Sequence, residues 1–223
     1  MLDMLDAEIF GIIVLTLRMT LMSTSISSII GVPLGLWLDR ADFAGKKLVV
    51  IFNRTLMASP PVVIGLVVYI LLMRNGPFGF LGLLFTLEAM VIAQVLLLTS
   101  IISGIVYTAS QRNAARIRSF AITMGANKMQ TQVLLVKEMG NEIFFAIITG
   151  FGRAMSEVGA IMIVGGNIRH HTRVMTTTIS LLRNRGEIDQ AIFLGVVLML
   201  IAFSVQMFAD FLRKRERRTD ENF

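Results

Sequence analysis

The sequence predicts an all-α integral membrane protein, and three observations carry that prediction. Hydrophobic residues make up 55% of the chain. They gather in blocks of about 20 or more, the length that a helix needs to cross a hydrocarbon core roughly 30 Å thick. Only 16% of the residues are charged, against about 25% in an average soluble domain. We therefore expect a single membrane domain over residues 1–223.

The apolar blocks predict five spans, at about 9–38, 48–73, 83–107, 141–164 and 188–212. The first is too long for the core of a signal peptide and lacks a basic leader, so we expect it to be retained. We expect a late break in it at Gly31, Pro33 and Gly35. Pro60 and Pro61 predict a kink or break in the second span, because each proline removes a backbone donor. Such a break survives in lipid only against protein or a wet cavity, so the second span should face the bundle interior.

Basic residues predict the orientation of the spans. They concentrate in the loop after the first span, in the long segment between the third and fourth, and in the tail "RKRERR". These regions alternate onto one side, which the positive-inside rule assigns to the cytoplasm. The N-terminus, with Asp3, Asp6 and Glu8, then lies outside and the C-terminus lies in the cytoplasm. The net charge of +6 thus indicates membrane topology rather than nucleic-acid binding.

The segment 165–187 should lie outside, although it carries four arginines, Arg169, Arg173, Arg183 and Arg185. Its first residues, Gly-Gly-Asn, read as a helix stop and turn. Outer arginines run against the positive-inside rule and need a reason. Either the segment folds outside the membrane with its arginines solvated or paired, or they form an electropositive mouth for an anion.

The segment of about 111–137 is long for a connection between membrane helices. Ile117, Phe120, Ala121 and Met124 share one helical face. Gly125 then breaks the pattern, and a second amphipathic stretch follows. The sequence thus predicts a short helix, a glycine turn and a second helix. These helices could lie on the bilayer surface or dock into a partner protein, and the pattern leaves both open.

Several motifs resemble those of a known family. The stretch from "SFAITMGANKMQ" to "GFGRAMSEVGA" resembles the cytoplasmic signature of permease subunits from binding-protein-dependent ABC importers, which Ala121 and Gly125 match. "PPVVIGL", "GRAMSEVGA" and "GGNI" together are similar to tungstate importer permeases, relatives of the molybdate and sulfate permeases. The similarity extends from about residue 20 to about residue 212. The chain departs from the general cytoplasmic signature at Ser119, Phe120, Lys137 and Glu138.

The resemblance implies the fold and function of a type I importer permease. That fold is a five-span bundle acting as a multi-pass homodimer in the cytoplasmic (inner) membrane, with the substrate path along the dimer axis. The turn at Ala121, Gly125 and Ala126 would dock into a separate ABC ATP-binding subunit, and an extracytoplasmic oxyanion-binding protein would deliver the ion. Tungstate is the favoured substrate, with molybdate or sulfate as alternatives.

The chain itself should be no enzyme and carry no cofactor. It has no G-x-x-x-x-G-K-[ST] phosphate loop, so ATP and Mg²⁺ would bind to the partner subunit. The carboxylates expected to be buried, Glu88 and Glu157, lack partners for acid–base work. His170 and His171 are adjacent and point apart, without a cysteine or carboxylate cluster nearby, so we expect no metal site. A passive channel or membrane scaffold is the alternative class. The structured cytoplasmic segment around Gly125 favours the importer over this alternative.

Arg153 and Glu157 are spaced i, i+4 in the fourth span. A charge in the middle of the membrane costs about 2.5–3.5 kcal/mol on insertion scales. The pair could brace the bundle or the dimer, or take part in gating and the anion path. Compact oxyanions such as tungstate are bound by hydrogen-bond donors, and a transport path should bind them weakly.

Hydroxyl groups are the candidates for such a path, although hydroxyls in membrane helices often bond to their own backbone. Candidates for the path are Thr99, Ser100, Ser103 and Ser156, beside Arg153 and Glu157. Candidates for the outer mouth or for contact with the binding protein are Asn167, Arg169, Arg173, Thr176 and Thr177.

Overall fold

The computed structural model describes the backbone of residues 2–220 and the side chains of residues 8–112, 114–209 and 211. All regular structure in this part of the chain is helical, which confirms the predicted all-α class. The tail arginines used for the orientation have side chains outside the described residues. In chain order the helices are α1 Leu2–Arg40, α2 Lys46–Ala58, α3 Pro61–Leu72, the 3₁₀ turn η1 Gly79–Leu81, α4 Leu87–Thr123, α5 Lys128–Glu138, α6 Gly140–Met155, α7 Gly159–Gly165, α8 Met175–Asn184 and α9 Ile188–Asp220.

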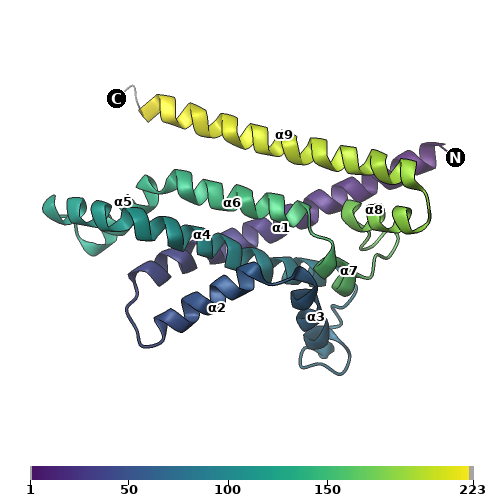
Figure 1. Cartoon of the computed structure of the whole chain (residues 1–223), viewed down its shortest axis with the longest axis horizontal. Helices are drawn as coiled ribbons and strands as arrows, with labels where there is room; N and C mark the ends of the chain where they lie inside the picture. The colour runs from purple at the N-terminus through teal and green to yellow at the C-terminus, as the bar shows by residue number, and fades with distance from the viewer. Residues whose placement is uncertain (1, 221–223) are drawn as a thin grey trace.

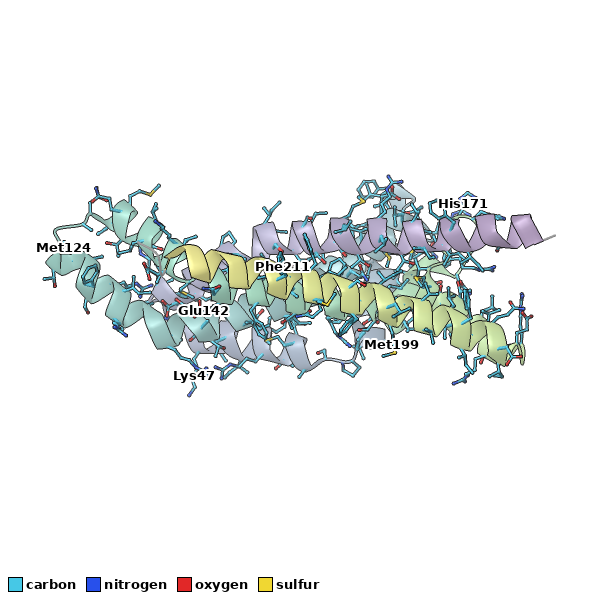
Figure 2. All side chains as sticks on the ribbon, turned by 90° about the horizontal axis from the view of Figure 1, so that it is seen from above. Lys47, Met124, Glu142, His171, Met199 and Phe211 are labelled. Atoms are coloured by element: carbon cyan, nitrogen blue, oxygen red, sulfur yellow. The ribbon has the colours of Figure 1, made fainter. Side chains whose placement is uncertain are left out.

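The long helices run along the long axis of the molecule, whereas α3 crosses it (Figure 1). The N-terminus, α7 and α8 lie at one end, and the turn between α4 and α5 projects at the other, beyond the end of α2. Figure 2 shows Met124 at the tip of that turn and His171 near the opposite end. Within the described residues, α1, α4 and α9 are each long and apolar enough to cross a membrane, and the bent pairs α2–α3 and α6–α7 could each form one more crossing.

Helix α1 packs closely against α4 through small residues. A Cβ atom on Gly35 would lie 2.7 Å from the carbonyl oxygen of Ser103, and one on Gly31 would lie 3.1 Å from the Cβ of Ile102. Small residues allow such close backbone approach in membranes. The predicted break at Gly31, Pro33 and Gly35 is wrong, since α1 continues to Arg40. Because α1 packs on α4 both before and after Pro33, the helix continues through this residue. The loss of one backbone N–H donor at Pro33 is tolerated.

The predicted break at Pro60 and Pro61 is confirmed. Helices α2 and α3 meet there at an angle of 105°, and Pro61 begins α3, where its missing N–H would have no helical partner anyway. A Cβ on Gly65 of α3 would lie only 2.6 Å from the Cα of Ala160 in α7. The second half of one bent pair therefore packs directly against the second half of the other.

The fourth predicted span, 141–164, is not one straight helix. It bends by 59° between Met155 and Gly159, giving α6 and α7. No proline marks this break. Instead the Glu157 carboxylate accepts a hydrogen bond from the backbone N–H of Ala160 at 3.1 Å. Such a local side-chain bond competes with continuation of the helix and begins a new one.

The segment 165–187, which we predicted to lie outside, contains a helix, α8, that the sequence did not lead us to expect. Two threonine hydroxyls satisfy backbone donors at its start. Thr16 of α1 accepts from the N–H of Met175 at 3.0 Å, and Thr177 accepts from the N–H of Val174 at 3.1 Å. The first of these contacts fastens the segment 165–187 to α1.

The segment 111–137 differs from its prediction in one respect. Its first helix is no separate element, because α4 continues without interruption from Leu87 to Thr123. The glycine turn is confirmed, with Gly125 at φ +74°, where an L side chain is strained. The second helix is confirmed as α5, whose first turn Asn127 and Gln130 close with a reciprocal capping box.

Candidate functional site

The joint between α6 and α7 holds the charged pair predicted from the sequence. Arg153 Nη2 lies 3.6 Å from Glu157 Oε2, and the Glu157 side chain is only 4% exposed, whereas that of Arg153 is 43% exposed. The pairing is therefore confirmed, although Glu157 follows the end of α6 instead of lying inside a continuous helix. The carbonyl oxygen of Glu157 accepts a hydrogen bond from the Thr176 hydroxyl at 2.8 Å. Glu157 thus joins α6, α7 and α8.

The two charges of this joint have different chemical reach. Glu157 is committed to Arg153 and to the backbone of α7, and its negative charge would repel an oxyanion. Arg153 has five N–H donors in a planar fork and remains partly exposed. Its outer donors can therefore face an anion or a second copy of the chain while the inner ones face Glu157.

A glutamine that the sequence reading missed supports the same joint. Gln94 of α4 is 1% exposed. Its Nε2 donates to the carbonyl oxygen of Ala154 at 2.9 Å, and its Oε1 accepts from the Ser23 hydroxyl at 2.6 Å. The Ala154 carbonyl also accepts from the N–H of Glu157 at 3.3 Å, so Gln94 adds a side-chain donor at the C-terminal end of α6. The sequence contains an indication of this role, since Gln94 is a polar residue inside the apolar run "EAMVIAQVLLL".

The end of the molecule that is predicted to lie outside carries a second charged group, centred on Glu8 of α1. Arg169 binds this carboxylate in a bidentate manner, with Nε to Oε1 at 2.8 Å and Nη2 to Oε2 at 2.5 Å. The bond to Glu8 raises the pKa of Arg169. Arg173 Nη1 lies 3.6 Å from the same carboxylate. Arg169 and Arg173 are thus both paired with Glu8, and this group of three charges keeps one positive charge in excess. The electropositive mouth stays a prediction.

A cavity of about 330 Å³ adjoins this group, and Glu8, Arg18, His170 and Arg173 are its polar lining. Arg18 was not singled out from the sequence, although it lies inside the first apolar run. The carbonyl oxygen of Asn167 accepts a hydrogen bond from Arg173 at 3.4 Å. Glu88, expected to be buried, is exposed in the first turn of α4.

The candidate hydroxyls are mostly engaged within the chain. The Ser103 hydroxyl, for example, donates to Asn53 Oδ1 of α2 at 3.1 Å, so it fastens two helices together. The hydroxyl of Thr99 is buried without a hydrogen-bond partner among the described residues. The other candidates donate to protein oxygens: Ser100, Ser103, Ser156, Thr176 and Thr177. An ion could use these groups only after such bonds open.

The projecting turn between α4 and α5 presents an apolar surface. Ala121 is 1% exposed, and its carbonyl accepts from the N–H of Ala126 at 2.9 Å. Ala121 therefore shapes the turn from inside, while Gly125 lies at its surface. Large apolar side chains stand exposed around the turn: Phe120, Ile122, Met124, Met129 and Val133. Such a patch on a projecting element marks an interaction site.

An acidic residue that the sequence reading passed over anchors the base of this projection. Asp39, at the end of α1, accepts from Arg118 Nη2 of α4 at 2.7 Å and also from Gln111. Its backbone carbonyl accepts from Lys46 Nζ at 3.2 Å. Asp39 is 8% exposed, so this network is sheltered from water. It ties the extension of α4 to the connection between α1 and α2.

Two bent apolar helix pairs, a charged joint inside the pair α6–α7 and a projecting apolar turn are the features expected of a helical membrane transport subunit. Residues 31–218 match the family described as "Binding-protein-dependent transport system inner membrane component". The chain belongs to this family and is an inner-membrane protein.

Three relatives show the breadth of the similarity. The chain is 42% identical over 200 residues, 90% of its length and 88% of the relative's, to "Tungstate uptake system permease protein TupB" of Peptoclostridium acidaminophilum. It is 35% identical over 214 residues, 91% of its length and 86% of the relative's, to the protein of the same name from Campylobacter jejuni. It is 28% identical over 209 residues, 90% of its length and 92% of the relative's, to "Molybdenum transport system permease protein ModB" of Azotobacter vinelandii.

Proposed function

We propose that this chain is the membrane subunit of an ATP-driven tungstate importer. The observation that carries the proposal is the 42% identity to a tungstate uptake permease along 90% of the chain. The molybdenum permease is less similar, at 28% identity, so molybdate is the second candidate and sulfate the third. An extracytoplasmic protein would deliver the ion, and an ABC ATP-binding subunit would drive its passage.

The arrangement proposed for the membrane has five crossings per chain. The helices α1, α4 and α9 each supply one, and each bent pair supplies another. The N-terminus lies outside and the C-terminus in the cytoplasm. Two chains form a homodimer with the path along its axis. Arg153 supports this arrangement, because a half-exposed arginine in an apolar span needs a protein or aqueous surface opposite it.

Coupling to the ATP-binding subunit is assigned to the turn around Gly125. The exposed apolar side chains about this turn would seat in a cleft of the partner, and the sheltered Asp39–Arg118 contact would pass its displacement on to α1. This use of the turn accounts for its apolar surface better than a position on the bilayer does, because the turn projects along the same axis as the long helices (Figure 1).

Reconstitution tests the proposal directly. The chain is combined in proteoliposomes with the ATP-binding subunit and the binding protein encoded beside it, and uptake of tungstate, molybdate and sulfate is measured with and without ATP. We expect ATP-dependent uptake with tungstate preferred. Uptake that is equal with and without ATP would identify a passive channel, and no uptake of any of the three ions would refute an oxyanion importer.

A further inference from the structure

Arg54 is another arginine inside an apolar run, and among the described residues none pairs with it. It lies on α2, eight residues after Lys46, where that helix begins, which is about 12 Å along the axis at 1.5 Å per residue. Its side chain is exposed and has no hydrogen bond or ion pair to any residue that the structure describes. A charged group in a membrane helix faces protein or a wet cavity and marks an ion pathway by default.

The surroundings of Arg54 form a crevice of about 180 Å³ between the end of α1, α2 and α4. The neighbouring residue Asn53 fixes α2 on α4, because its amide donates to the carbonyl of Ser100 at 3.2 Å and accepts from the Ser103 hydroxyl. Tyr107 also lines the crevice, and its hydroxyl has no hydrogen bond among the described residues. The remaining lining residues are Leu38, Val50, Met57, Gly104 and Thr108.

We propose that Arg54 and Tyr107 form a transient binding site for a tetrahedral oxyanion in the cytoplasmic half of the transport path. This inference rests on the proposed function. The guanidinium offers a fork of N–H donors suited to an oxyanion, and the phenol offers one O–H donor. The apolar side chains that line the crevice lower the local polarity, which strengthens hydrogen bonds made inside it. Two donor groups make a weak site, as transport requires, since the ion must leave.

The phosphate of a lipid headgroup offers the same chemistry, so the test separates a transported ion from a lipid. The complete transporter in proteoliposomes carries Arg54→Gln, Arg54→Lys or Tyr107→Phe, with Lys47→Gln as the matched control. Lys47 is an exposed cation and the second residue of the same helix, and it does not line the crevice. Uptake of tungstate at saturating binding protein and the thermal stability of each variant are measured together.

We expect Arg54→Gln to slow uptake roughly ten- to hundred-fold, the size of lost charge-assisted hydrogen bonds. Arg54→Lys should retain part of the rate, because its charge remains without the fork, and Tyr107→Phe should lose a few-fold. Lys47→Gln should stay within about twofold of the unaltered protein, since an exposed charge contributes little. Midpoints of thermal unfolding should change little in all four. If Arg54→Gln fails to fold, the uptake rates of Arg54→Lys and Tyr107→Phe test the site instead, and rates equal to that of the unaltered protein would refute it.

Three outcomes overturn the proposal. Uptake by Arg54→Gln equal to that of the unaltered protein removes the site while leaving the importer intact. Stabilisation of the unaltered protein in detergent by added phosphatidylglycerol, lost in Arg54→Gln while uptake is unchanged, assigns the site to a lipid phosphate. Failure of the unaltered transporter to import any oxyanion refutes the proposed function and this site with it.

Discussion

Removing either Arg153 or Glu157 alone should destabilise the protein more than removing both. The two charges lie 3.6 Å apart. At that distance the attraction between unit charges is about 1 kcal/mol in water and about 4–5 kcal/mol at an effective dielectric constant of 20. Because Arg153 is 43% exposed, solvent screens the pair, so the value falls toward the aqueous limit. We expect a coupling energy of about 1–2 kcal/mol, below the 3–5 kcal/mol typical of breaking a fully buried pair.

The assay is a double-mutant cycle of Arg153→Met, Glu157→Gln and the double variant, scored by reversible unfolding in mixed detergent micelles. Glutamine is chosen because its oxygen can still accept from the N–H of Ala160, which separates the lost charge from the lost helix cap. Each single variant should lose more unfolding free energy than the double variant does. The loss in the double variant should therefore be smaller than the sum of the two single losses. If the two effects add within about 0.5 kcal/mol, the accuracy of additivity for independent sites, the residues are not partners and the reasoning fails.

The same cycle distinguishes assembly from gating. The double variant keeps the neutral hydrogen bonds of the joint and should regain most of the stability lost in the single variants. If its ATP-dependent uptake recovers in parallel, the pair only braces the bundle. Uptake that stays low in a protein of restored stability would assign the exposed donors of Arg153 to the path or its gate.

Three further predictions concern the turn, the outer end and the crossing of the bent pairs. Gly125→Trp should insert and fold, at a strain cost of about 1–2 kcal/mol for the left-handed conformation, but lose ATP-dependent uptake; normal uptake would remove the coupling role. Neutralising Arg169 and Arg173 together should slow uptake and flatten its salt dependence, and an unchanged salt slope would contradict an anion mouth. Gly65→Leu should lower the unfolding free energy by about 1–3 kcal/mol, because its Cβ would meet the backbone of Ala160. An unchanged unfolding free energy would show that α3 and α7 can move apart without cost, and would contradict this prediction.

The features predictable from the sequence are those that depend on nearby residues. The break at Pro60 and Pro61 follows from missing donors, the turn at Gly125 from a glycine that interrupts the helical pattern, and the Arg153–Glu157 contact from i, i+4 spacing. Each is local in the chain and is present in the structure. The five apolar runs likewise became helical segments, because their length and composition decide helix formation in lipid.

The contacts that could not be predicted join residues far apart in the chain. Gln94 reaches a carbonyl 60 residues away, Arg118 reaches a carboxylate 79 residues away, and Met175 is capped from 159 residues away. Each polar side chain was visible in the sequence, but its partner depends on which helices pack together. The bend at Glu157 belongs to the same class, since the hydroxyl of Thr176 on another helix supports it.

Helix α1 shows why local propensity misleads in this fold. Glycine and proline at Gly31, Pro33 and Gly35 predict an interrupted helix when the segment is considered alone. In the bundle the same glycines remove the side chains that would keep α4 at a distance, so the residues that weaken the isolated helix strengthen its packing. An unbroken α1 then reaches from Glu8, which binds the outer arginine Arg169, to Asp39 at the base of the projecting turn. The continuity of α1 therefore places the Glu8 group and the base of the projecting turn on one helix.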